Sequence, residues 1–140
     1  MKKPAKKGRK MMINELTGKC HCGKNTFAIK NKPEFQFICY CNDCRLLNSG
    51  GHLCGMVFDQ AQLQKAKEIQ TYTYKGGSGN PIIMHFCPVC STQLYAFPTE
   101  YKDKVVVRAN TLDASEFKPQ QYLFTETAFP WDDSISLKGR

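Results

Sequence analysis

The sequence lacks any long apolar run, and this absence narrows the class of protein. No stretch approaches the roughly 18–20 consecutive apolar residues of a membrane-spanning helix, so we expect no membrane partner. The positive charges at the N-terminus are not followed by the apolar segment of about 7–15 residues that a secretory signal requires. We therefore expect a cytoplasmic protein, in which cysteine thiols stay reduced.

Acidic residues are missing from the first ten positions, which carry six of the 20 basic residues. Residues 11–140 have a net charge of only +2, so the overall charge of +8 belongs mainly to the N-terminus. We interpret residues 1–11 as a disordered basic leader and residues 12–140 as a single domain; translation starting at Met11 or Met12 is an alternative. Nucleic-acid binding is expected only through the leader.

Helical periodicity is scarce, and much of the chain alternates or is rich in β-branched and aromatic residues. The glycine-rich segment 76–81 predicts a hairpin turn; it lacks the Gly-Lys-Ser/Thr ending of a phosphate loop. Strands at a spacing of about 8–12 residues predict a mostly β fold, a sandwich or a folded sheet. The predicted strands are 26–30, 34–40, 53–58, 69–74, 82–86, 92–97 and 104–108, with short helical turns near 59–64 and 113–117.

Cysteine is abundant, and seven of the eight cysteines lie in three tight clusters. An even count could indicate four disulfides in a secreted protein. The absence of an export signal and the clustering of the thiols favour metal binding instead. The clusters are Cys20 and Cys22; Cys39, Cys41 and Cys44; and Cys87 and Cys90.

The spacing of the clusters suggests two zinc sites. Each outer cluster supplies a pair of sulfurs, and the two pairs form a natural four-thiolate set that would join distant parts of the chain. Such a saturated site is typical of structural zinc. The middle cluster supplies only three sulfurs, and three protein ligands with an open position are typical of catalytic zinc. We therefore expect one structural and one catalytic zinc ion.

Other interpretations of the middle cluster remain open. It could be a second structural zinc site closed by Cys54, His21, His52 or His85, or a redox sensor. Cys54 lies in an apolar strand, where a lone cysteine is more often a small core residue. Arg45, directly after Cys44, could hold an acidic substrate or form a surface salt bridge.

The three cysteine motifs, in this order, resemble the glutathione-dependent formaldehyde-activating enzyme family, also called the CENP-V/GFA domain family. The residues concerned are 18–23 (Gly-x-Cys-x-Cys-Gly), 39–45 (Cys-x-Cys-x-x-Cys-Arg) and 86–90 (Phe-Cys-x-x-Cys). Thr111-Leu112-Asp113 and Trp131 also resemble family features. Two positions depart from the pattern: Ser91 replaces the usual glycine, and Tyr122 replaces a frequent histidine.

The resemblance implies an Mss4-like (β-tent) architecture, in which zinc staples antiparallel sheets that contain few short helices. It assigns Cys20, Cys22, Cys87 and Cys90 to a structural zinc, and Cys39, Cys41 and Cys44 to a second zinc linked to activity.

The implied activity is that of a zinc-dependent carbon–sulfur lyase of the S-(hydroxymethyl)glutathione synthase type. Such an enzyme forms or breaks the adduct of glutathione, or another thiol, with formaldehyde or another small aldehyde. The alternative is a non-enzymatic zinc-binding interaction module of the same fold.

Overall fold

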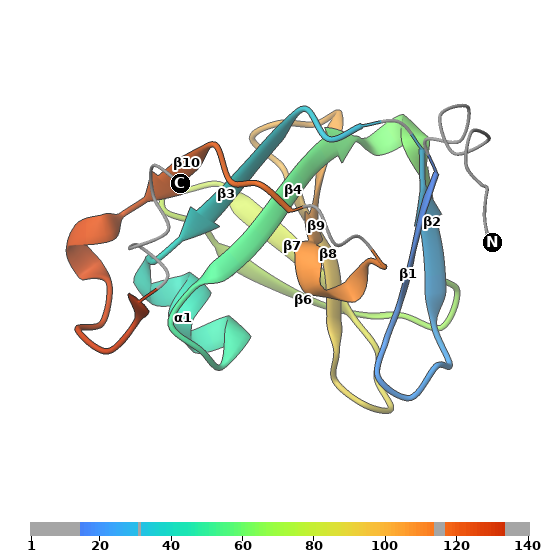
Figure 1. The fold of residues 1–140 in the computed structure, drawn as a ribbon. Helices are drawn as coiled ribbons and strands as arrows, with labels where there is room; N and C mark the ends of the chain where they lie inside the picture. The colour runs from blue at the N-terminus through green and yellow to red at the C-terminus, as the bar shows by residue number, and fades with distance from the viewer. Residues whose placement is uncertain (1–14, 31, 114–116, 134–140) are drawn as a thin grey trace, which may run out of the picture.

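The computed structural model describes residues 15–30, 32–113 and 117–133, which form two β-sheets and one α-helix (Figure 1). The predicted basic leader, residues 1–11, lies outside the described residues, so the expectations about it stay predictions. Within the described ranges, no helix is long and apolar enough to cross a membrane.

The larger sheet has seven strands in the order β10-β3-β4-β9-β8-β7-β6. Every neighbouring pair is antiparallel except β10 and β3, which are parallel. The strands are β3 (Phe35–Cys39), β4 (Leu53–Asp59), β6 (Gln70–Lys75), β7 (Pro81–Phe86), β8 (Gln93–Pro98), β9 (Lys104–Arg108) and β10 (Gln121–Leu123).

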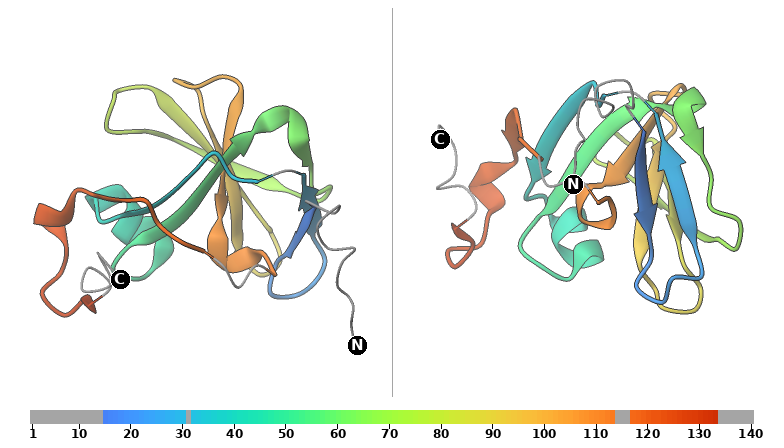
Figure 2. Two further views of the ribbon diagram at one scale, coloured as in Figure 1. Left: turned by 45° about the horizontal axis from the view of Figure 1, so that its top comes forward. Right: turned by 45° about the vertical axis from the view of Figure 1, so that its right-hand side comes forward.

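A smaller antiparallel sheet stands across one face of the larger one, as both views in Figure 2 show. It consists of β1 (Leu16–Lys19), β2 (Thr26–Ile29) and the short β5 (Leu63–Gln64). A bridge between Gly18 and Leu112, just after the 3-10 turn η3 (Ala109–Thr111), ties β1 to the end of β9. The remaining 3-10 turns are η2 (Gln60–Gln62) and η4 (Thr125–Thr127).

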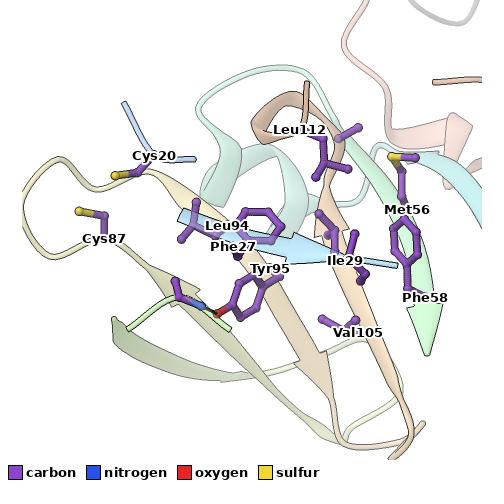
Figure 3. Close-up of a cluster of buried hydrophobic side chains, with 13 residues drawn as sticks. Cys20, Phe27, Ile29, Met56, Phe58, Cys87, Leu94, Tyr95, Val105 and Leu112 are labelled. Carbon is purple, nitrogen blue, oxygen red and sulfur yellow. Dashed lines mark hydrogen bonds between the residues drawn. The ribbon is translucent and has the colours of Figure 1, made fainter. Parts of the chain in front are cut away.

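The main core fills the space between the two sheets (Figure 3). Side chains alternate across a strand, so residues two apart share a face. Phe27 and Ile29 of β2 therefore point together toward the larger sheet, where Val105 and Val107 of β9 are fully buried. Cys20 and Cys87 lie at one end of this core, which places the first and third cysteine motifs side by side.

The opposite face of the larger sheet carries a second, smaller core and the helix α1 (Asn42–Asn48). Phe37, Cys39 and Leu53 are its buried members, and Cys41 and Cys44 pack against them. The strand alternation thus separates the two metal-ligand sets, one on each face of the same sheet.

The prediction of a mostly β, antiparallel fold with few short helices is confirmed, and the seven predicted strands correspond to β2, β3, β4, β6, β7, β8 and β9. Helix α1 and strands β1 and β10 were not predicted. The expected helical turn near 59–64 is split into η2 and β5. Residues 114–116 of the other expected turn lie outside the described residues.

Close packing at Gly55 on β4 provides a test of this fold. A Cβ atom at Gly55 would lie 2.5 Å from the Phe37 ring on the neighbouring strand, whereas a Cβ at Gly77 would meet nothing within 4 Å. We expect Gly55→Ala to lower the free energy of unfolding by about 1–3 kcal/mol through overpacking. Gly77→Ala should change it by less than about 0.5 kcal/mol. Urea unfolding of both variants measures the difference; equal effects would contradict the packing.

Candidate metal centres

The first centre brings together two cysteine pairs that are about 65 residues apart in the chain. The sulfurs of Cys20, Cys22, Cys87 and Cys90 all lie within 4.8 Å of one another. The Cys22 sulfur is 3.6 Å from that of Cys20 and 3.8 Å from that of Cys87. Four sulfurs at the corners of a tetrahedron, each about 2.3 Å from a zinc ion, are separated by about 3.8 Å. The arrangement therefore fits a tetrahedral thiolate site and is far too open for disulfides.

Left-handed backbone residues close the turns that present these sulfurs. Gly23, directly after the first pair, has φ of +82°, a conformation that glycine adopts without steric cost. Ser91, directly after the second pair, has φ of 74°. This conformation explains why the family pattern has a glycine where this chain has Ser91, and it costs the serine of the order of 1 kcal/mol.

Hydrogen bonds act differently on the sulfurs of the first centre: the Lys24 backbone N–H lowers the pKa of Cys22, but burial and the neighbouring thiols outweigh it and raise that pKa to about 11. The backbone N–H of Asn25 donates to the Cys20 sulfur over 3.3 Å, and that of Cys22 donates to the Cys90 sulfur over 3.5 Å. The hydrogen bond from the Thr92 hydroxyl, followed by that from the Cys22 N–H, lowers the pKa of Cys90 to about 5. Such donors stabilise ligands that must lose a proton to bind a metal.

The second centre is built from a single short segment at the end of β3. The sulfurs of Cys39, Cys41 and Cys44 lie within 4.8 Å of one another. Cys41 is the N-cap of α1, and its sulfur accepts a hydrogen bond of 3.4 Å from the Cys44 backbone N–H. The helix therefore holds Cys44 against the two sulfurs that precede it.

The three thiols of the second centre differ in pKa. A hydrogen bond from the Cys44 side chain lowers the pKa of Cys39 to about 6, and the same bond raises the pKa of Cys44. Burial raises the pKa of Cys41. One thiolate thus forms readily at neutral pH, while a metal would have to displace the protons of the other two.

Among the described residues, none of the four candidate closing ligands joins the second cluster. Nδ1 of His52 lies 2.7 Å from a carboxylate oxygen of Asp132, and the ring of His85 packs against Tyr95 and Phe97. Cys54 packs against the main core, on the other face of β4. The backbone of His21 lies in the first centre. The geometry gives the second cluster three protein sulfurs.

Arg45 forms no salt bridge with a carboxylate among the described residues. Its guanidinium carbon lies 4.2 Å from the ring centroid of Phe129, and Phe129 stacks on Trp131 at 4.8 Å. Its Nη2 donates a long bond of 3.4 Å to Asn42. These contacts attach the C-terminal segment to α1.

Sequence reasoning singled out Arg45 but missed two further residues on this side of the sheet, Gln93 and Arg108. The buried side-chain atoms without a hydrogen-bond partner in the described part of the chain are Nε of Arg45, Nε of Arg108 and Oε1 of Gln93. Gln93 donates its amide to the carbonyl of Leu47 in α1. The sequence feature that could have identified Arg108 is its position as the only arginine of the predicted apolar strand 104–108, at the end of that strand.

A large cavity of about 1250 Å³ lies beside the first centre rather than the second. The β1–β2 pair, β5 and the η3 turn line it, and its charged side chains are Lys19, Lys24, Lys65, Lys67, Glu68 and Asp113. None of the three sulfurs of the second centre borders this cavity. The predicted pocket beside the second cluster therefore does not coincide with it.

Comparison with known proteins places these motifs in a family. The family model described as glutathione-dependent formaldehyde-activating enzyme matches residues 15–127. A crystal structure of a Rhodobacter sphaeroides protein, solved as a structural genomics target, is similar in fold, with a TM-score of 0.58 and 16% sequence identity over 76% of this chain and 98% of that one. No curated protein gives a significant match.

The left-handed backbone at Ser91 generates a prediction. We expect Ser91→Gly to raise the free energy of unfolding by about 0.5–1 kcal/mol, because glycine relieves the steric cost of a positive φ. Ser78→Gly, in the β6–β7 turn, should not stabilise the protein, because Ser78 has no positive φ and its hydroxyl accepts a hydrogen bond from Asn80. Chemical denaturation of the two variants provides the measurement, and a destabilised Ser91→Gly protein would contradict the interpretation.

The first centre generates a second prediction. We expect Cys90→Ala to release one metal ion per chain and to cost more than about 4 kcal/mol of stability, because metal binding at a site that joins distant segments contributes directly to folding. Cys54→Ala is the matched control, since Cys54 lies outside both clusters. It should keep the full metal content and lose about 1 kcal/mol. Elemental analysis and thermal unfolding distinguish these outcomes.

Proposed function

Because the chain belongs to the glutathione-dependent formaldehyde-activating enzyme family, we propose that it binds two zinc ions and catalyses the reversible addition of a thiol to a small aldehyde. Glutathione and formaldehyde are the proposed substrates, and the cytoplasm, where thiols stay reduced, is the proposed location. One observation carries the proposal: the second centre gathers three cysteine sulfurs and, among the described residues, no fourth protein ligand.

The first centre has the proposed role of a staple. Its four sulfurs are soft ligands at separations suited to a tetrahedral zinc ion. It joins the turn after β1 to the turn after β7, so it holds the smaller sheet over the main core. With four protein ligands, such a centre has no position for a substrate.

The second centre has the proposed catalytic role. In the reaction, the sulfur of the thiol forms a bond to the aldehyde carbon, the π pair of the carbonyl moves to the oxygen, and the proton lost by sulfur ends on that oxygen. A free thiol has a pKa near 8.5 and is mostly protonated at neutral pH. Zinc at this centre would supply the missing activation, because a coordinated thiol loses its proton.

The chain's own residues set the conditions for this step. Cys39 is buried at the end of β3, while Cys41 and Cys44 are half-buried, so the cluster is closed on the side of the sheet. Helix α1 fixes the third sulfur, and Gln93 ties the far end of that helix to β8. The outward side remains for substrates.

A non-enzymatic interaction module is the second proposal, and one observation favours it. Leu46 of α1 is 72% exposed and Trp131 is 65% exposed, and the contact between Arg45 and Phe129 brings their segments together. Exposed apolar side chains gathered in one region are typical of protein-binding surfaces. Under this proposal both zinc ions would be structural.

The variant Cys41→Ser decides between the two proposals. The enzyme proposal expects it to lower the affinity of the second zinc and to abolish adduct formation, because hydroxyl oxygen is a poor zinc ligand compared with thiolate. The first zinc and the thermal unfolding midpoint should change little. Zinc content, calorimetry and turnover of formaldehyde with glutathione provide the three measurements.

The control is Cys90→Ala, which should strongly destabilise the fold. If Cys41→Ser destabilises the fold as severely as Cys90→Ala, the second centre is a structural staple and the interaction module replaces the enzyme. If Cys41→Ser retains full turnover, the second centre does not carry the chemistry.

A further inference from the structure

Arg108 is a buried cation on the face of the sheet that carries the second centre. It ends β9, where it lies opposite Gly55 of β4, and it is only 3% exposed. Strand alternation puts its side chain on the same face as Val106, which packs against the small core of Cys39 and Leu53. Arg108 therefore lies on the same side of the sheet as α1 and the three clustered sulfurs.

The partners of Arg108 do not neutralise it. Its Nη2 donates to the sulfur of Met84 over 3.3 Å, a weak acceptor, the neutral Tyr74 side chain is a second hydrogen-bond partner, and Nε has no partner among the described residues. No carboxylate forms an ion pair with it in the described ranges. Arginine keeps its proton in proteins, and an isolated buried charge is strongly unfavourable.

Packing places Arg108 close to the second centre, because Val106, on the same face of β9, packs against the small core that Cys41 and Cys44 also contact. Burial lowers the pKa of Arg108, and its neighbours Tyr74, through a side-chain hydrogen bond, and Cys44 oppose this shift. Tyr74 belongs to the same group: burial raises its pKa to about 12, the charge of Arg108 opposes this, and the charges of Cys44, Asp43 and Cys41 add to it. The guanidinium and the thiols therefore share one electrostatic environment.

Charge counting connects these observations. Three thiolates around a divalent ion leave a net charge of −1, which one buried guanidinium balances. A fourth ligand that is also anionic would raise the charge of the centre to −2, and the nearby cation reduces the cost of that step.

We propose that Arg108 is the counter-charge of the second metal centre, and that it makes the open position select an anionic thiolate over a neutral ligand. This inference rests on the proposed metal site at Cys39, Cys41 and Cys44. It assigns Arg108 a positioning role that acts on the ligand through the electrostatic field, without contact to the reacting atoms.

The test uses the full chain loaded with cobalt(II), whose absorption reports ligand exchange at each centre. The second centre is titrated with 2-mercaptoethanol, which carries no charge except on its thiolate, and with neutral imidazole. We expect Arg108→Met to weaken mercaptoethanol binding about tenfold or more and to change imidazole binding less than about twofold. Arg108→Lys should keep the preference of the unmodified protein, because it retains the charge.

Arg45→Met is the matched control, since it removes the same charge next to Cys44 from a half-buried position, whereas Arg108 is almost fully buried. Its effect on the ratio of the two affinities should stay below about threefold. An equal effect of Arg45→Met would show that overall charge sets the preference and would overturn the role of Arg108. An unchanged ratio in Arg108→Met, or equal weakening of both ligands, overturns it as well.

Folding is monitored by the cobalt spectrum of the first centre, and Arg108→Gln is a second neutral variant. Failure of both neutral variants to fold would overturn the inference, because the charge would then serve the fold. The failure of the proposed function looks different: the unmodified protein would bind only one cobalt ion, or its second ion would exchange no ligand. That result removes the metal site itself, and the inference with it.

Discussion

The convergence of two cysteine pairs at the first centre is the constraint on which the remaining structure depends. One pair follows β1 and the other follows β7, so the four sulfurs connect the smaller sheet to the larger one at one end of the main core. Two residues before Cys20, the bridge between Gly18 of β1 and Leu112 makes a second connection. A domain of this size buries a limited apolar area, so its core contributes only a modest free energy of folding. A metal bound at the first centre would add to that free energy.

The two candidate centres lie on opposite faces of one sheet, and under the proposed function this placement separates a structural task from a catalytic one. The first centre takes its ligands from two turns, and both the backbone and Thr92 donate hydrogen bonds to its sulfurs. The second takes all of its ligands from the segment 39–44 and closes no distant loop. Loss of a metal there removes few long-range constraints. A centre of this kind can change its ligands while the main core stays intact.

The sequence allowed much of this arrangement to be predicted, because the decisive patterns are local. Alternation of apolar residues placed strands such as β6 and β9, and cysteine spacing defined both ligand sets. Helix α1 was not predicted because its seven residues show no apolar periodicity, although Gly50 and Gly51 after it are typical of a helix end. Strand β10 was not predicted because it has only three residues and because its parallel partner, β3, lies about 80 residues earlier in the chain.

Arg108 marks the limit of local patterns. By sequence, an arginine at the end of a strand looks like a solvent-facing residue, and only the pairing of β9 with β4 and the covering of that face bury it. Burying the charge of Arg108 costs desolvation free energy. A neutral residue of similar size at this position would avoid that cost. Among the described residues with unpaired atoms, Arg45 belongs to α1, Gln93 bonds to α1, and Arg108 lies on the face of the sheet that carries α1. Polar groups left unsatisfied in this way are rare in folded proteins, and two of these three are guanidinium donors on the side of the sheet that carries the second centre.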